Sequence, residues 1–241
     1  MTCARAHGSR IPTRVARPPS RGDAFSLPAQ RYPRPVAVDH YFSAQPASPD
    51  ERRTVVVHLA GRELTLQTAG GVFSPDHVDH ATRVLLDEVP PPPGAGDLLD
   101  LGCGWGPIAL ELALRSPDAR VWAVDVNERA LDLVRHNAAA AGAPHVHAVQ
   151  PDDVPDDVRF AAIWSNPPIR VGKEALHALL LRWLPRLAPG GSAYLVVGKN
   201  LGADSLQRWL ADQLAGRAEV TRRASAKGFR VLEVTAADAT P

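Results

Sequence analysis

The tripeptide Asn166-Pro167-Pro168 is the part of this sequence whose residue types most clearly suit a chemical role. It follows a hydrophobic run, residues 160–164, that reads as a buried strand. Proline lacks an N–H and has a fixed φ, and it keeps the preceding residue out of helical geometry, so we expect a stiff, extended loop whose carbonyl oxygens point outward. The Asn166 side-chain oxygen and the Pro167 carbonyl could then accept both hydrogens of one planar NH2 group. Such a clamp would hold the nitrogen lone pair toward an electrophile, as methylation of an amide or a nucleobase amine requires.

A glycine-rich loop upstream indicates where the electrophile would bind. An apolar run leads into Asp100-Leu-Gly-Cys-Gly-Trp-Gly106, and Pro107 stands where the first turn of a helix tolerates proline. The glycines allow a tight turn and a close approach of the backbone to a ligand, but a dinucleotide fingerprint would need a glycine in place of Pro107. The spacing instead suits a ligand that carries an amino acid. The loop residues expected at this site are Asp100, Gly102, Cys103, Gly104 and Gly106.

Acidic residues at the ends of two later strands continue the same predicted site. Residues 121–124 read as a strand that ends at Asp125, where a carboxylate can bind both ribose hydroxyls of an adenine nucleoside. A further strand, residues 145–149, ends close to Asp152 and Asp153, and an acid there can accept a hydrogen bond from the adenine amine. Because the carboxyl ends of parallel strands share one edge of a sheet, we expect these groups to line a single nucleoside-binding crevice.

With these motifs, residues 38–234 resemble a class I S-adenosylmethionine-dependent methyltransferase. More narrowly, they resemble the methyltransferase small domain family, which includes ribosomal RNA guanine-N2 methyltransferases. The narrower resemblance rests on residues 40–43 (HYFS), 68–74 (TAGGVFS), 166–173 (NPPIRVGK), 201–206 (LGADSL) and 226–232 (AKGFRVL). It implies S-adenosylmethionine as the cofactor, S-adenosylhomocysteine as its product, ribosomal RNA or a ribosomal subunit as the substrate, and no metal.

The resemblance also implies a role for each site residue. The methionine part of the cofactor would lie over the glycine loop, and the ribose on Asp125 next to Val126. The adenine would lie beside Asp152 and Asp153. The catalytic residues would be Asn166, Pro167 and Pro168, with Asn166 facing the cofactor's methyl group. Substrate contacts are expected from Phe73, Ile169, Arg170, Lys173 and Lys199.

Two positions depart from the family pattern. The helix after residues 68–74 usually carries Asp-x-Gly-Thr, whereas this chain has Asp79-His-Ala-Thr82, which leaves the part of this helix in cofactor binding open. Ile169 stands where many amine methyltransferases have Phe or Tyr to stack on a base, so stacking must be weaker or come from another side chain. Two alternatives remain. One is a protein glutamine-N5 methyltransferase, which shares the clamp but usually follows it with Tyr, and the other is a non-catalytic module that binds the cofactor.

Composition favours one α/β domain in a reducing compartment. The chain has 241 residues, enough for a single doubly wound sheet with a buried core. Its only cysteines are Cys3 and Cys103, so no disulfide framework is expected and a cytoplasmic protein is predicted. The protein is also expected to be a monomer. No apolar run approaches the about 20 residues of a transmembrane helix, and no set of histidines and cysteines has zinc-like spacing.

Charge and patterning divide the chain into three parts. Residues 1–37 hold seven arginines and one acid, and read as a disordered, basic, Pro/Arg-rich tail of charge +6. Since the formal net charge is +1, the remaining residues carry −5, so contact with RNA would depend on local basic groups. Residues 38–93 read as a preamble with a hairpin (54–59 and 63–68) and a helix (76–89). Residues 94–236 read as a Rossmann-like core with a seven-stranded sheet, including a strand at 192–197 and a C-terminal antiparallel hairpin of 218–223 with 229–234.

Overall fold

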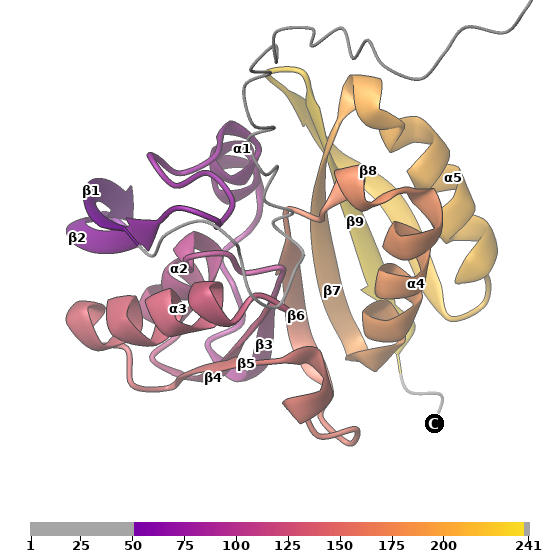
Figure 1. Cartoon of the computed structure of the whole chain (residues 1–241). Helices are drawn as coiled ribbons and strands as arrows, with labels where there is room; N and C mark the ends of the chain where they lie inside the picture. Colours follow the sequence, from indigo (N-terminus) through magenta and orange to yellow (C-terminus); the bar gives the residue numbers. More distant parts are fainter. Residues whose placement is uncertain (1–50, 239–241) are drawn as a thin grey trace, which may run out of the picture. The chain divides into compact units, whose positions relative to one another are not determined.

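The computed structural model describes residues 51–238 (Figure 1). The predicted tail, residues 1–37, and the family segment at 40–43 lie outside the described residues. The described part begins with a two-stranded antiparallel hairpin, β1 (Arg52–Leu59) and β2 (Arg62–Ala69), which confirms the hairpin predicted from residues 54–59 and 63–68.

A seven-stranded sheet in the order β5-β4-β3-β6-β7-β9-β8 forms the centre of the fold. Its strands are β3 (Ala95–Leu101), β4 (Asp118–Val124), β5 (Val146–Val149), β6 (Phe160–Ser165), β7 (Leu187–Gly198), β8 (Ala218–Ala226) and β9 (Phe229–Ala236). Strands β3 to β7 are parallel to their neighbours in that group, whereas β9 pairs antiparallel with both β7 and β8. The predicted doubly wound sheet with a C-terminal antiparallel hairpin is therefore confirmed.

The order of the strands places the site. From β3 the chain adds β4 and β5 on one side and then returns to add β6 and β7 on the other, so the topological switch point lies between β3 and β6. Ligands of open parallel sheets bind at the carboxyl ends of the strands beside such a point. The glycine loop follows β3 and the Asn-Pro-Pro step follows β6, so both motifs lie at this crevice.

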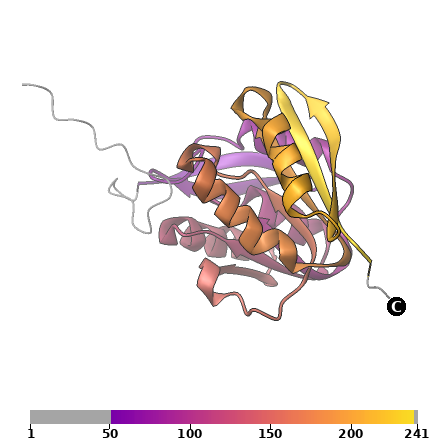
Figure 2. The ribbon, with the colours of Figure 1, turned by 90° about the vertical axis from the view of Figure 1, so that its right-hand side faces the viewer.

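Helices cover both faces of the sheet. They are α1 (His80–Glu88), α2 (Pro107–Arg115), α3 (Glu128–Ala141), α4 (Lys173–Trp183) and α5 (Ala203–Gln213). Buried side chains of α1, α2 and α3 share one hydrophobic cluster, whereas those of α4 and α5 belong to a second that includes Phe160. Other buried residues of α2 and α3 pack in a third cluster with β1 and β2. Neighbouring residues of β3 divide between the two clusters, Leu98 in the first and Leu99 in the second, as side chains of a strand alternate between faces. Figure 2 shows α4 and α5 in front of the sheet.

Some predicted boundaries are corrected. The helix predicted at 76–89 begins only at His80, because Asp79 has an extended backbone (φ −53°, ψ 147°) and caps the helix with its side chain. The strand predicted at 192–197 is longer, since β7 begins at Leu187, and both strands of the C-terminal hairpin are longer than predicted.

A buried asparagine joins the β1–β2 hairpin to the core. The Asn137 side-chain oxygen accepts the backbone N–H of Gln67 at 2.7 Å, and its amide nitrogen donates to the Gln67 carbonyl at 2.8 Å. The same nitrogen donates to the Trp105 carbonyl at 3.0 Å. One side chain thus binds the backbone of a preamble strand and the backbone of the glycine loop, and so holds the preamble against the part of the core that carries this loop.

Candidate active site

The glycine loop is held by hydrogen bonds at its beginning and lies close against α3 at its end. The backbone N–H groups of Gly102 and Cys103 both donate to the Val124 carbonyl, at 2.9 and 3.1 Å. Gly106 has a φ of 100°, and a Cβ there would lie 3.1 Å from a Val134 methyl carbon of α3. This position therefore requires glycine, both for its backbone conformation and for the close approach of α3.

Two carboxylates lie beside this loop, Asp100 fully buried and Asp125 partly buried. One oxygen of Asp100 accepts the Ala109 N–H of α2 at 2.8 Å, while the other is buried and has no hydrogen-bond partner among the described residues. The two oxygens of Asp125 accept backbone N–H groups, from Gly104 at 3.0 Å and from Asn127 at 2.9 Å. Burial raises the pKa of both carboxyls, and the Asp125 charge raises that of Asp100 further.

These two carboxylates fit S-adenosylmethionine. An unpartnered carboxylate oxygen under a glycine loop suits a ligand with an ammonium group and a sulfonium charge, because an opposite charge favours the ionised carboxylate. The two Asp125 oxygens have about four acceptor positions, which the backbone N–H groups fill only in part, so a position remains for a ribose hydroxyl.

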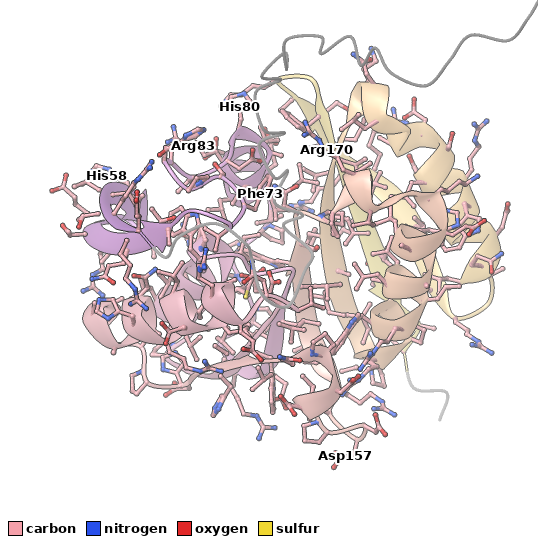
Figure 3. All side chains as sticks on the ribbon, in the orientation of Figure 1. His58, Phe73, His80, Arg83, Asp157 and Arg170 are labelled. Carbon is pink, nitrogen blue, oxygen red and sulfur yellow. The ribbon has the colours of Figure 1, made fainter. Side chains whose placement is uncertain are left out.

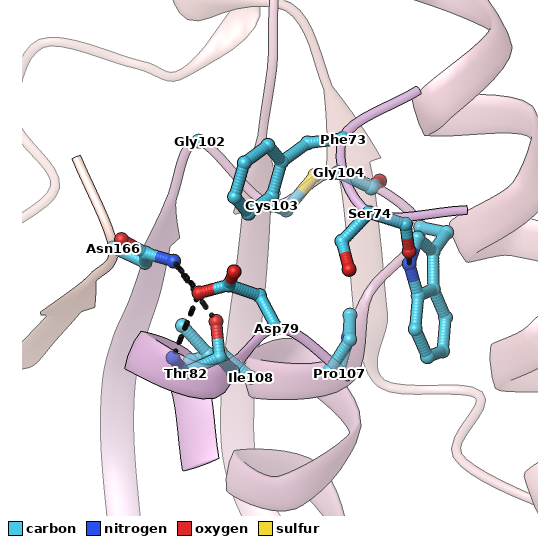
Figure 4. Close-up of a pocket in the computed structure, with 11 residues that line it drawn as sticks. Phe73, Ser74, Asp79, Thr82, Gly102, Cys103, Gly104, Pro107, Ile108 and Asn166 are labelled. Carbon is cyan, nitrogen blue, oxygen red and sulfur yellow. Dashed lines mark hydrogen bonds between the residues drawn. The ribbon is translucent and has the colours of Figure 1, made fainter. Parts of the chain in front are cut away.

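The Asn166 side chain is fixed in one orientation. Its amide nitrogen donates to a carboxylate oxygen of Asp79 at 2.9 Å and to the Thr82 hydroxyl at 3.1 Å (Figure 4). Both amide hydrogens are thereby used, and no described residue donates to the side-chain oxygen. The acceptor end of the carboxamide is therefore the end left for a substrate.

The two prolines form a tight turn rather than a loop with free carbonyls. Pro168 has φ −73° and ψ 77°, the geometry of an inverse γ-turn, and the Ile169 N–H donates to the Pro167 carbonyl at 2.8 Å. The Pro168 carbonyl accepts the Val171 N–H at 3.2 Å. The predicted extended loop is therefore a tight turn at Pro168, and both proline carbonyls accept a local hydrogen bond, although the Pro167 oxygen keeps a second lone pair.

A small cavity joins the two motifs (Figure 4). Asn166 lines it together with Phe73, Ser74, Asp79, Thr82, Gly102, Cys103, Gly104, Trp105, Pro107 and Ile108. Phe73 is 47% exposed, and its loop is tied to the core because the Ser74 carbonyl accepts the Trp105 indole N–H at 3.0 Å and the Gly71 carbonyl accepts the Asn127 amide at 2.9 Å. The cavity therefore lies where the preamble, the glycine loop and the end of β6 meet.

Comparison with known proteins shows the family to which the chain belongs. The family model described as Methyltransferase small domain matches residues 63–233. The chain belongs to the methyltransferase small domain family. It is an S-adenosylmethionine-dependent methyltransferase of the kind that includes the ribosomal RNA methyltransferase RsmC.

Individual relatives of this methyltransferase differ in how far they match. The uncharacterized protein YbxB of Bacillus subtilis (strain 168) is 37% identical over 170 residues, which cover 69% of this chain and 85% of that protein. Ribosomal RNA small subunit methyltransferase C of Pseudomonas aeruginosa (strain LESB58) is 36% identical over 65% of this chain and 49% of its own length. A solved T. thermophilus 16S rRNA N2 methyltransferase (RsmC), in complex with AdoMet and guanosine, matches with a TM-score of 0.67 at 26% identity, over 78% of this chain and 51% of that one. The methyltransferase thus spans about half the length of its RsmC relatives.

The predicted adenine-side residues of the methyltransferase have different surroundings. The Asp152 side chain is 91% exposed and pairs with Arg182 of α4 at 2.8 Å. Asp153 instead lines a shallow groove with Gln150 and Glu128. Val126, directly after Asp125, is one of the exposed large hydrophobic residues and so is accessible to a flat ring.

The predicted substrate residues also divide. Ile169 is half-buried, packs against the hydrophobic cluster of α4 and α5, and does not line the cavity. Three of the predicted cations form no ion pair with any residue from 51 to 238: Arg170, Lys173 and Lys199. Figure 3 shows Arg170 and Phe73 in the same upper part of the view. By contrast, the cations of the last hairpin are paired with acids: Arg222 and Arg230 with Asp204, Arg223 with Glu233, and Lys227 with Asp87.

Other features of the methyltransferase are simpler. Burial, together with the charges of Asp125 and Asp100, raises the pKa of the Cys103 thiol, which keeps it protonated and unsuited to act as a nucleophile. No group of three or more potential metal ligands lies together within residues 51–238. In the same range, no helix is long and apolar enough to cross a membrane.

Six residues that line the cavity were not predicted as site residues from the sequence: Ser74, Asp79, Thr82, Trp105, Pro107 and Ile108. The motif Asp79-His-Ala-Thr82 was a visible signal, but its contact with Asn166 joins residues 87 positions apart and leaves no local pattern.

Proposed function

We propose that this methyltransferase acts on the exocyclic N2 amine of a guanine in ribosomal RNA. The observation that carries the proposal is the orientation of Asn166, whose amide hydrogens are held by Asp79 and Thr82 so that its oxygen is free to accept. An acceptor beside the second lone pair of the Pro167 carbonyl suits a planar NH2 group, which offers two hydrogens in one plane.

The chain's residues act by positioning and by charge stabilisation. S-Adenosylmethionine, when bound, supplies the electrophilic methyl group. Asn166 and Pro167 each accept one amine hydrogen, so the nitrogen lone pair is directed out of the plane of the NH2 group. Both acceptors place partial negative charge next to the nitrogen, where positive charge develops as it is methylated, and the Asp79 carboxylate behind Asn166 strengthens this effect. A target base in a stacked helix would have to be flipped into the cavity to reach them.

Stacking and phosphate contacts are assigned to different residues. We assign the stacking role to Phe73, because it is the exposed aromatic side chain that lines the cavity with Asn166, whereas Ile169 packs against the core. We assign phosphate contacts to Arg170, Lys173 and Lys199, since their charges are not neutralised by acids within the described part of the chain.

The nature of the RNA is supported by similarity. The RsmC structure that shares the fold is described as a complex with AdoMet and guanosine, and RsmC proteins are named for the small ribosomal subunit. The proposed partner is ribosomal RNA or a ribosomal subunit. We further propose that the protein is a monomer and acts in the cytoplasm, where ribosomes are found.

Mass spectrometry of ribosomal RNA nucleosides tests the proposal directly. A strain lacking the gene should lose N2-methylguanosine from one ribosomal RNA position, and the wild-type gene should restore it while an Asn166→Ala gene should not. Unchanged RNA accompanied by loss of N5-methylglutamine from a protein would replace the proposal with the glutamine methyltransferase alternative. Unchanged RNA and protein in all strains would point to a cofactor-binding module.

A further inference from the structure

One oxygen of Asp79 serves three donors from two parts of the fold. It accepts the backbone N–H groups of Ala81 at 2.8 Å and Thr82 at 3.3 Å, which cap the beginning of α1. It also accepts the Asn166 amide at 2.9 Å, and the second hydrogen of that amide goes to the Thr82 hydroxyl at 3.1 Å. The beginning of α1 and the Asn-Pro-Pro segment after β6 are therefore joined in a single hydrogen-bonded centre, formed by Asp79, Thr82 and Asn166.

We propose that Asp79 and Thr82 are positioning residues that hold the Asn166 carboxamide with its oxygen toward the substrate. The role of that oxygen in holding a target amine rests on the proposed function, but its orientation does not. In a free asparagine, the oxygen and the nitrogen of the carboxamide can exchange places by rotation. Here the rotated form would bring the amide oxygen against the Asp79 carboxylate, and both amide hydrogens would lose their acceptors.

The same contact tunes the acceptor. A carboxylate that binds the nitrogen end of a carboxamide polarises the amide and makes its oxygen a stronger hydrogen-bond acceptor. The Asp79 charge is thus transmitted through Asn166 to the substrate side without Asp79 itself having to touch the substrate. This is the arrangement expected when a catalytic group is fixed in advance by the residues behind it.

The helix that carries the pair is itself anchored. The His80 ring packs edge-on against Phe229 of β9, with ring centroids 5.7 Å apart, and Ala81 is buried in the hydrophobic cluster that α1 shares with α2 and α3. Because Ala81 contributes only its backbone N–H to the centre, any residue other than proline can supply that bond. This explains why alanine can replace the glycine found at this position in the family pattern.

Two pairs of substitutions separate positioning from helix capping. Serine and asparagine are both good N-caps, so Asp79→Ser should keep α1 but not reach Asn166, whereas Asp79→Asn keeps an oxygen in place and loses only the charge. Thr82→Val removes the hydroxyl with little change in shape, and Thr82→Ser keeps it. Asp76→Asn is the matched control, because Asp76 lies in the same segment and, among residues 51–238, forms its ion pair with Arg53 on the surface.

The first measurement needs no substrate. Nuclear magnetic resonance of the full-length protein should show the Asn166 side-chain amide, identified by its loss in Asn166→Ala, with slow hydrogen exchange in the wild type and in Asp76→Asn. Exchange should be faster in Asp79→Ser and Thr82→Val, and fastest in the double variant. Equal exchange in all variants would overturn the proposal.

The second measurement is single-turnover methyl transfer to ribosomal RNA. We expect the Asp79→Ser/Thr82→Val double variant to lose about 10- to 100-fold in rate with the affinity for S-adenosylmethionine little changed, and Asp79→Asn and Thr82→Ser to recover most of that loss. In an Asn166→Ala background the double variant should have no further effect, because residues that act through one group are not additive. An equal loss in both backgrounds would refute the positioning role. If the wild type methylates no RNA while the amide exchange still responds, the proposed function fails and the positioning role stands.

Discussion

Trp105 donates its indole N–H to the Ser74 carbonyl at 3.0 Å and so joins the glycine loop to the loop that carries Phe73. The two loops belong to the core and the preamble, 31 residues apart in sequence, and both line the cavity beside Asn166. A movement of the glycine loop on cofactor binding would therefore also move Phe73.

Replacement of Trp105 by Phe should destabilise the protein more than the same change at Trp183. Both side chains are buried, but the Trp105 N–H has a partner, whereas the Trp183 N–H has none among the described residues. Trp105→Phe leaves the Ser74 carbonyl without its donor, which costs about 1–3 kcal/mol beyond the loss of packing that the two variants share. Urea denaturation of both variants measures the difference, and equal free energies of unfolding would mean that this hydrogen bond contributes nothing.

The affinity for S-adenosylmethionine should fall as the pH falls through the raised pKa of Asp100. The cofactor-free fold favours protonated Asp100, because burial and the Asp125 charge raise its pKa, while a bound cation favours the carboxylate. Binding should therefore release a proton below the raised pKa and become independent of pH above it. Isothermal titration in buffers of different ionisation enthalpy measures the released protons.

Asp100→Asn should abolish this dependence on pH, and S-adenosylhomocysteine, which lacks the sulfonium charge, should show a weaker one. Proton uptake on binding, or a dependence that survives in Asp100→Asn, would show that another group titrates.

Some features of the site could be predicted from the sequence and others could not. The glycine loop, Asp125 and Asn166 each follow directly after a hydrophobic strand, so local pattern and sheet topology together place them at one edge. The orientation of Asn166 and the anchoring of the preamble by Asn137 depend on hydrogen bonds across 70 or more residues. A polar residue inside a helix, such as Asn137, looks the same in sequence whether it is exposed or, as here, fully buried.

The end of α1 that faces Asn166 was misplaced for a related reason. Apolar periodicity indicates that a helix is present but does not fix its first turn. Here the cap decides it, since Asp79 binds the N–H groups of Ala81 and Thr82 and excludes residues 76–78 from the helix.

Asn166→Ala should abolish most methyl transfer while the fold and cofactor binding remain. The residues that fit the cofactor lie after β3 and β4, and Asn166 lies after β6, so its loss removes the acceptor and leaves those residues in place. Loss of one preorganised group of this kind lowers the rate by about 10²- to 10³-fold. Single-turnover transfer from labelled S-adenosylmethionine to deproteinised ribosomal subunits gives the rate, and titration with S-adenosylhomocysteine is the control for cofactor binding. A variant that retains wild-type rate would remove the clamp from the mechanism.

Binding to RNA should depend on the unpaired cations and not on the paired ones. Each phosphate contact contributes about 0.7 to the slope of log affinity against log salt for a single strand, so the triple variant of Arg170, Lys173 and Lys199 to Ala should flatten the slope by about 2. The matched control is the triple variant of Arg222, Arg223 and Lys227 to Ala, in which each lost cation already has a carboxylate partner. Filter binding of a ribosomal RNA fragment over a range of salt concentrations measures both slopes. If the control flattens the slope as much as the first triple variant does, the last hairpin also contacts the phosphates and the assignment to Arg170, Lys173 and Lys199 alone is wrong.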